Sequence, residues 1–385
     1  TFHRESKTFI TNRVFIDPLS MILEEGHLQK LGVHDAFQRL HIHLDCPIVT
    51  PYHRAVGQTS EFEGPERIGT TGPGVGEAVS DHFAGEQFTL RFKDLFIYDR
   101  MIRKLSSIRD RNLNKFEGYK NRHYIDHFIS EYDLADTYQE FLPSIENCAY
   151  RESDYDSPEC LIYEGAQGAL LDPRYGFGPY VTKIGTTSSM IPDRSGVYKL
   201  GVIRGYMTRH GWGPLITEDF DLTKKLPEMH NSGSRCQGEF RIGWLDLVAL
   251  RYSILINDGI DGLAVTNLDR LQGLDSVKVA TSYRCKSTSK HLEELFITQP
   301  MNGSTEITGI KKTSSIRRGL LTYILETCTP RYEGLRGQEL VEFLEEFLNV
   351  PVVITSHSAD LQGKSLIQPI MKHSWRSHVH AACSN

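Results

Sequence analysis

Short apolar runs alternate with glycine-rich or polar turns along this chain. Three of these runs, residues 160–163, 200–203 and 262–266, predict strands that end at a turn. Helical periodicity is clearest in residues 244–257 and 337–348, and an apolar strand follows each predicted helix. Strands that alternate with helices predict an α/β protein with a mainly parallel sheet, in which ligands bind beyond the carboxyl ends of the strands.

The length of 385 residues accommodates one large α/β domain or two ordinary ones. Residues 99–155 are rich in charged residues and tyrosine, and they predict a helical excursion from the sheet. Residues 372–385 carry three histidines and little patterned hydrophobicity, so we expect a loose tail there.

Composition narrows the class of protein. Lysine and arginine number 43 against 49 acidic residues, a net charge of -6, which argues against a protein that binds nucleic acid through phosphates. Seven widely spread cysteines without a CxxC or Cys/His pattern indicate reduced thiols. No run approaches the roughly 18 apolar residues of a membrane helix, and the start shows no signal peptide, so we expect a cytoplasmic protein that does not bind membranes.

A loop at residues 67–76 combines four glycines with two threonines, including Thr71. Such a loop can form a nest of N–H groups and hydroxyls for a phosphate, although an ordinary glycine-rich surface loop has the same composition. No Gly-Lys-Ser/Thr follows, so the loop is not a Walker A motif.

Other polar residues follow the predicted strands. Gln167 can donate to and accept from the edge of a base, and Thr182 offers a hydroxyl to a phosphate, but a structural turn would use the same residues. Arg209 could bind a carboxylate or a phosphate, or could simply face solvent. Asp269, after the strand at 262–266, could accept two hydrogen bonds from guanine.

In their order along the chain, these segments resemble the adenylosuccinate synthetase family. The matching segments are a glycine-rich loop (68–76), an EGAQG turn (163–172) with a following PxVT loop (179–187), and a TR-GxGP-TE segment (208–218). A GWLD helix start (243–246) and a base-reading turn (266–274) follow. The segments at 46–55 and 348–352 also resemble the family. Only residues 99–155 and the tail lie outside this resemblance.

The resemblance implies a single domain over residues 1–385, built on a large, mainly parallel central sheet flanked by helices, a P-loop-NTPase-like ligase fold. It also implies a homodimer that uses GTP and Mg²⁺ to join inosine monophosphate (IMP) to L-aspartate through 6-phosphoryl-IMP. The residues that match the family's IMP ligands are Thr71, Gln167 and Thr182. Those that match its aspartate and GTP ligands are Arg241 and Arg235, and Asn267, Asp269, Ser356 and Ser358.

The family's catalytic Asp and His lie in segments that precede Thr1 in this alignment, since Thr1 fits the Thr of the family's GHT segment. We therefore expect no catalytic residue and no Mg²⁺ ligand among these 385 residues, and we predict that the chain alone is inactive.

Several positions depart from the family pattern. Asn267 stands where the family has Lys, and residues 356–361 replace its SxGPDR pattern, which puts the preference for GTP in question. Glu239 lies in the aspartate loop, where it would repel a dicarboxylate.

These departures leave two alternatives open. One is a relative of the phage enzymes that convert deoxyguanylate (dGMP) to its aminosuccinyl form. The other is a non-catalytic paralogue that binds purine nucleotides.

Overall fold

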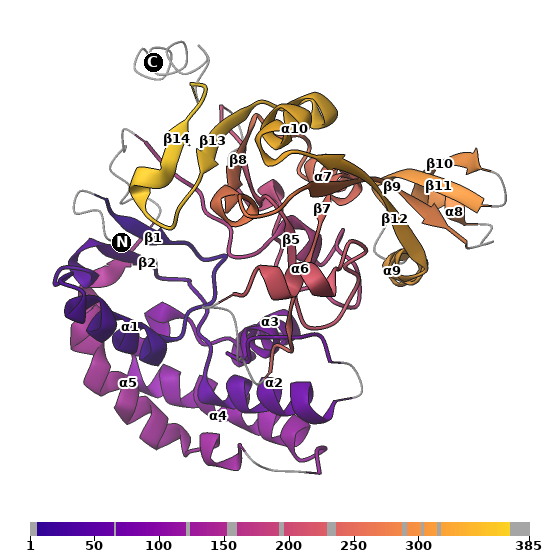
Figure 1. Cartoon of the computed structure of the whole chain (residues 1–385). Coiled ribbons are helices and arrows are strands. Elements are labelled where there is room, and N and C mark those ends of the chain that lie inside the picture. The colour runs from indigo at the N-terminus through magenta and orange to yellow at the C-terminus, as the bar shows by residue number, and fades with distance from the viewer. Residues whose placement is uncertain are drawn as a thin grey trace, which may run out of the picture. The chain divides into compact units, whose positions relative to one another are not determined.

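The computed structural model describes residues 6–64, 67–120, 124–151, 160–191, 196–228, 236–286, 291–301, 304–313 and 317–369 (Figure 1). The chain divides into two compact units, Thr1–Ile162 and Tyr163–Asn385, and each is described by itself. A single domain over residues 1–385 stays a prediction. The tail expected at 372–385 lies outside the described residues.

The first unit combines a small parallel sheet with α-helices. Its elements, in chain order, are β1 (Thr8–Ile10), α1 (Pro18–Lys30), η1 (Phe37–Arg39), β2 (Leu40–His43), α2 (Pro51–Glu63), α3 (Val75–Ala84), η2 (Glu86–Phe88), η3 (Phe92–Phe96), α4 (Tyr98–Phe116), η4 (Ile125–His127), α5 (Glu131–Ile145), η5 (Glu146–Cys148) and β3 (Ala149–Tyr150). The strands are parallel in the order β1-β2-β3.

Helix packing supplies the core of the first unit. Helix α2 packs on α3 and α4, and α4 packs on α5. The buried residues Ile42, Tyr52, Leu105 and Leu134 bring β2, α2, α4 and α5 into one apolar cluster. Helix α4, which begins at Tyr98, and helix α5 occupy much of residues 99–155, where a helical excursion was expected from the sequence.

The second unit carries most of the strands. Its elements are η7 (Ala169–Leu171), η8 (Ser188–Met190), β4 (Leu200–Arg204), β5 (Met207–His210), α6 (Phe220–Lys225), β6 (Phe240–Gly243), β7 (Leu245–Asp246), α7 (Leu247–Ile256), β8 (Gly262–Thr266), η9 (Leu268–Leu271), β9 (Val277–Cys285), α8 (Leu292–Leu295), β10 (Phe296–Met301), β11 (Ser304–Ile310), α9 (Arg318–Glu326), β12 (Cys328–Leu335), η11 (Gly337–Glu339), α10 (Leu340–Leu348), β13 (Val352–Ser356), η12 (Leu361–Gly363) and β14 (Lys364–Leu366).

These strands form three sheets in the described part of the second unit. Strands β4, β8 and β13 are parallel neighbours, and β14 adds an antiparallel edge to β13. Strands β10, β11, β9 and β12 form an antiparallel sheet, to which β7 adds a parallel pair with β9 (Figure 1). Strands β5 and β6 form an antiparallel ribbon.

The apolar pattern predicted the parallel sheet of the second unit well. The expected strands at 200–203 and 262–266 are β4 and β8, and the expected helices correspond to α7 and to η11 with α10. Each helix leads into a parallel strand, because α7 precedes β8 and α10 precedes β13. An α/β fold with parallel-rich sheets flanked by helices is therefore confirmed.

The strand predicted at 160–163 is wrong. Leu161, Ile162 and Tyr163 are exposed and belong to no sheet of the described chain. Without a neighbouring strand, their backbone groups gain no ladder hydrogen bonds, so apolar composition alone does not produce a strand here.

None of the helices in the described residues is long and apolar enough to cross a membrane.

Asp246 caps α7 from inside the apolar core of the second unit. Its carboxylate is 2% exposed and accepts hydrogen bonds from the Ala249 N–H (3.0 Å) and from the Tyr283 hydroxyl (2.7 Å). Burial raises the pKa of the Asp246 carboxyl to about 6, and these hydrogen bonds only partly oppose the increase. The carboxyl therefore retains a proton in the folded state over a pH range in which the unfolded chain has lost it.

We predict that Asp246→Asn flattens the pH dependence of stability. The stabilisation of the folded state by protonated Asp246 is fully present below about pH 4 and is lost as the pH rises through about 6. This loss lowers the unfolding free energy of the wild type by at most about 3 kcal/mol. Asparagine keeps the helix cap and the contact with Tyr283 without ionising. Urea unfolding between about pH 4 and 7 should therefore show a smaller loss of unfolding free energy for the variant.

Asp219→Asn provides the control of opposite sign. Asp219 is only partly buried, and this desolvation raises its pKa, but hydrogen bonds from the Leu222 N–H and the Trp244 indole outweigh it and hold the pKa below its usual value. Its stabilisation is lost only as the pH falls below about 4, so Asp219→Asn should leave the slope between about pH 4 and 7 unchanged. Parallel curves for wild type and Asp246→Asn would contradict the prediction.

Candidate functional site

The carboxyl ends of the parallel strands β8 and β13 bring four of the predicted ligand residues to one edge. In the register of the pair, Val265 of β8 lies opposite Thr355 of β13. Strand β8 ends at Thr266 and β13 ends at Ser356, and the turn η9 contacts β13. The residues that the structure gathers here are Asn267, Asp269, Ser356 and Ser358.

The turn after β8 presents the carboxylate of Asp269. Asn267 has a left-handed backbone (φ 59°), and its side-chain oxygen accepts from the Thr266 hydroxyl (3.0 Å). Leu268 and Leu271 are buried and anchor η9, whereas Asp269 between them is partly exposed. Within the described chain, the Asp269 carboxylate makes no hydrogen bond or ion pair, so it is available to accept from a ligand.

The turn after β13 is held by its own polar groups. The Ser356 hydroxyl donates to the Ser358 carbonyl, and the Ser358 hydroxyl donates to the Asp360 carbonyl, each at 3.2 Å. Lys364 Nζ donates to the Ser358 carbonyl at 2.6 Å. Since both hydroxyl protons are used within the turn, the two serines can meet a ligand mainly as acceptors.

Asp172 organises the segments that carry Gln167 and Thr182. Its buried carboxylate accepts from the N–H groups of Arg174 (2.8 Å) and Thr186 (2.9 Å), which joins the turn after η7 to the loop beyond Thr182. The Thr182 N–H donates to the Leu171 carbonyl at 2.9 Å. Thr182 is therefore partly buried in an ordered loop, whereas Gln167 is exposed and follows no strand.

Arg241, the predicted aspartate ligand, already forms an ion pair. Its guanidinium donates to both carboxylate oxygens of Glu218 (2.8 and 2.5 Å), and its Nη1 donates to the carbonyls of Gly211 and Gly213. Sequence reasoning missed this pairing, although Glu218 lies in the recognised 208–218 segment. Arg235, the other predicted aspartate ligand, lies outside the described residues.

A second guanidinium lies opposite Arg241 in the β5–β6 ribbon. Arg209 and Arg241 are direct cross-strand partners. Arg209 donates to the carbonyls of Trp212 (2.7 Å) and Tyr180 (3.1 Å), but no carboxylate pairs with it among the described residues. Burial, with a smaller contribution from the charge of Arg241, lowers the pKa of Arg209 to about 10. An anion beside Arg209 would relieve that destabilisation of its charged form.

In the first unit, the glycine-rich loop connects α2 to α3. Thr71 at its tip is exposed, and the Gly72 N–H donates to the Thr70 hydroxyl oxygen at 3.2 Å. Gly69, Gly72 and Gly74 have φ values of 78°, 80° and 88°, a conformation that residues with a side chain rarely adopt. The loop thus has the conformation of an anion nest with Thr71 accessible.

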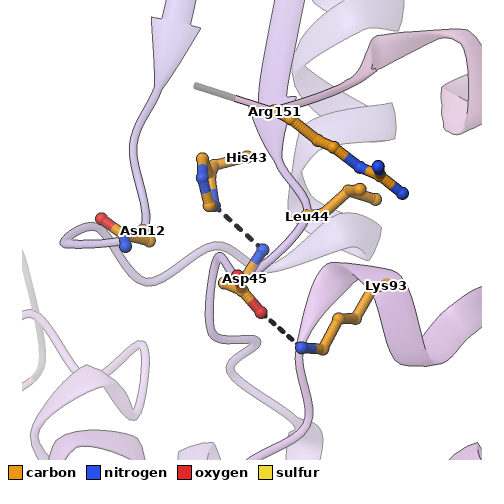
Figure 2. Close-up of a pocket in the computed structure, with 6 residues that line it drawn as sticks. All are labelled: Asn12, His43, Leu44, Asp45, Lys93 and Arg151. Carbon is orange, nitrogen blue, oxygen red and sulfur yellow. Dashed lines mark hydrogen bonds and ion pairs between the residues drawn. The ribbon is translucent and has the colours of Figure 1, made fainter. Parts of the chain in front are cut away.

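The first unit also has a cavity that sequence reasoning did not identify. It has a volume of about 490 Å³ and lies at the carboxyl ends of β1, β2 and β3, and Figure 2 shows its lining residues: Asn12, His43, Leu44, Asp45, Lys93 and Arg151. Lys93 Nζ lies 2.5 Å from Asp45 Oδ1, and this hydrogen bond lowers the pKa of Asp45. The Asp45 N–H donates to His43 Nδ1 at 3.0 Å. Because these groups are paired with each other, we do not assign a ligand to this cavity.

No group of three or more His, Cys, Asp or Glu side chains in the described residues could hold a metal ion. The Mg²⁺ implied by the resemblance therefore has no matching ligand set in this part of the chain.

Comparison with known proteins identifies the family. A family model described as adenylosuccinate synthetase matches residues 1–363. The adenylosuccinate synthetase of Nitrosomonas eutropha is 35% identical over 299 residues, 74% of this chain and 68% of the relative. That of Chlorobium limicola is 32% identical over 369 residues, 92% of this chain and 82% of the relative.

A solved structure agrees with these relatives at the level of the fold. The fully ligated adenylosuccinate synthetase from Plasmodium falciparum matches with a TM-score of 0.72 and 20% identity, over 95% of this chain and 86% of that chain. Neither a dGMP-specific ligase nor a non-catalytic paralogue is favoured by these matches. The chain belongs to the adenylosuccinate synthetase family, the ligases that make adenylosuccinate in purine nucleotide biosynthesis.

Proposed function

We propose that this chain carries the nucleotide-binding and aspartate-binding residues of a GTP-dependent ligase that joins IMP to L-aspartate. The observation that carries the proposal is the convergence of Asn267, Asp269, Ser356 and Ser358 at one edge of the parallel sheet. The family resemblance assigned these four residues to GTP from two segments about 90 residues apart.

Asp269 is the proposed reader of guanine. A carboxylate that accepts from both N1–H and N2–H₂ of guanine distinguishes it from adenine, which has no donor at either position. The buried leucines on either side of Asp269 fix the turn, so the carboxylate is oriented before the ligand binds. Asn267, Ser356 and Ser358 border the same edge and complete the proposed guanine site.

Gln167, Thr182 and Thr71 are the proposed IMP ligands. The Asp172 carboxylate orders the loop of Thr182, which supports a phosphate-binding role for that hydroxyl. Exposed Gln167 leaves its amide free to meet the hypoxanthine ring. Thr71 belongs to the first unit, where the nest-like conformation of its loop supports contact with a phosphate.

Positive charge at the β5–β6 ribbon supports a dicarboxylate substrate. Arg209 and Arg241 face one paired carboxylate, Glu218, and Arg209 has no carboxylate partner in the described residues. Exposed Glu239, just before β6, pairs with neither guanidinium there and would oppose a dicarboxylate. We assign the aspartate carboxylates to this ribbon, with Arg241 and Arg235 as ligands and Arg209 as the neighbouring charge. Arg241 would exchange or share its Glu218 partner when aspartate binds.

The chemistry that these residues serve is positioning and charge neutralisation. Transfer of the GTP γ-phosphoryl group to O6 of IMP makes that oxygen a good leaving group, and the aspartate amine then displaces it. Mg²⁺ supplied with GTP would neutralise charge on the phosphates. Because the described residues offer no metal cluster, we derive no step through the metal. We propose a homodimer, as the resemblance implies.

We predict that the natural full-length protein releases phosphate and changes the purine absorbance when IMP, aspartate and GTP are all present. Omitting GTP or IMP leaves the amine no activated oxygen to displace, and omitting aspartate removes the amine, so each omission should abolish turnover. Parallel assays with dGMP in place of IMP and ATP in place of GTP should be much slower. If IMP binds measurably but none of the nucleotide pairs gives turnover, the ligase proposal is refuted.

We predict that Asp269→Asn raises the KM for GTP by about 100-fold, the effect of losing a charged acceptor for two guanine donors, roughly 3 kcal/mol. The KM for IMP should stay within about twofold because Asp269 is not an IMP ligand. Steady-state kinetics with each substrate varied in turn provides the measurement.

Asp275→Asn is the matched control, since Asp275 is exposed shortly after the same turn. An equal rise in KM for GTP in both variants would show that Asp269 does not read the base.

A further inference from the structure

The glycine-rich loop at residues 67–76 is tied to α2 at both of its ends. At its start, the Gly69 N–H donates to Glu61 Oε1 at 2.6 Å, and Glu61 is 5% exposed. At its end, a Cβ on Gly74 would lie 2.5 Å from the Arg54 nitrogen and 2.6 Å from the His53 carbonyl carbon. The loop therefore rests directly on the first turn of α2.

His53 contributes a side chain as well as this backbone surface. Its Nδ1 accepts from the Thr50 N–H at 3.0 Å, so the proton of the neutral ring resides on Nε2. That Nε2 lies 3.3 Å from Asp81 Oδ2, a contact that is long for a hydrogen bond and close for an ion pair. Both side chains are essentially inaccessible to solvent, with 1% and 0% exposed.

Asp81 in turn fixes α3, which begins where the loop ends. Besides His53, its carboxylate contacts Arg111 Nε (2.8 Å), Lys115 Nζ (2.8 Å) and Asn112 Nδ2 (2.6 Å), all from α4. Burial alone would raise the pKa of Asp81, but the donors from His53, Lys115 and Arg111 hold it well below its usual value. The anionic carboxylate therefore links α3 to α2 and α4.

The tip of the loop has backbone N–H groups that remain available to a ligand. Thr71 is exposed, and the N–H groups of Thr70 and Thr71 make no hydrogen bond within the described chain. A loop that is fixed at both ends and has free donors at its tip is preorganised for an anion, because little ordering entropy remains to be lost on binding.

We propose that His53 and Asp81 are positioning residues whose contact holds the 67–76 loop in its anion-binding conformation. The anion is a nucleotide phosphate, and the identification of that nucleotide as IMP rests on the function proposed above. Neither residue touches the ligand: His53 supports Gly74 through its backbone, and Asp81 holds the helix that Gly74 begins.

Two substitutions at His53 separate its two contacts. In His53→Asn, the side-chain oxygen replaces Nδ1 as the acceptor for Thr50, but nothing reaches Asp81. In His53→Gln, the side-chain nitrogen takes the place of Nε2 beside Asp81, but the contact with Thr50 is lost. The pair is matched in polarity, so the difference between the variants reports on the Asp81 contact. Both are made in the natural full-length protein.

Hydrogen exchange of peptides within residues 67–76 and calorimetric titration with IMP are the readouts. We expect His53→Asn to speed exchange in the loop by about tenfold and to raise the Kd for IMP by about tenfold, with kcat at saturation within about threefold of the wild type. His53→Gln should stay within about threefold of the wild type in each readout. Exchange in α5 should be unchanged in both variants, which distinguishes loop loosening from general unfolding.

The proposal is overturned if His53→Asn leaves loop exchange and IMP affinity unchanged, or if both variants lose them equally. Titration with inorganic phosphate separates this proposal from the proposed function. If the wild type shows no ligase turnover while His53→Asn still loosens the loop and weakens phosphate binding, the ligase assignment fails and the positioning role stands.

Discussion

A carboxylate removed from water must receive hydrogen bonds from the protein, and this requirement fixes the functional loops in both units. Asp172 gathers backbone N–H groups from two segments and thereby joins the turn after η7 to the loop beyond Thr182. Asp81 gathers side chains from two helices and fixes the start of α3. Asp246 caps α7 from within the core. Asp172 and Asp246 thereby satisfy backbone N–H groups where the chain turns, whereas Asp81 joins three helices through side chains.

The β5–β6 ribbon uses the same principle with opposite charges. Arg209 and Arg241 lie directly opposite each other, an unfavourable pairing of like charges. Among the described residues, Glu218 pairs with Arg241 and not with Arg209. The carbonyls of residues 211–213 and of Tyr180 accept from the two guanidinium groups. The pairing of like charges costs stability, and binding of the dicarboxylate proposed above would offset that cost.

The sequence could predict the parallel sheet of the second unit because its signals are local. Strand β8 is an apolar run that ends at a polar turn, and α10 followed by β13 is a periodic helix followed by an apolar strand. The convergence of Asp269 and Ser356 follows from topology alone, since parallel neighbours place their carboxyl ends at one edge. The same local reasoning failed at Ile162, because an apolar run becomes a strand only where another strand accepts its hydrogen bonds.

The pairings within the candidate site could not be predicted, because they join side chains that are distant along the chain. His53, Asp81 and Lys115 come from three helices, and nothing in their own segments specifies that they meet. Asn267 shows the intermediate case. Its difference from the family's Lys puts the preference for GTP in question, yet asparagine tolerates the left-handed conformation observed at this position (φ 59°) better than most residues. The substitution therefore favours the geometry of the turn that presents Asp269, even though it removes a cation from the edge of the sheet.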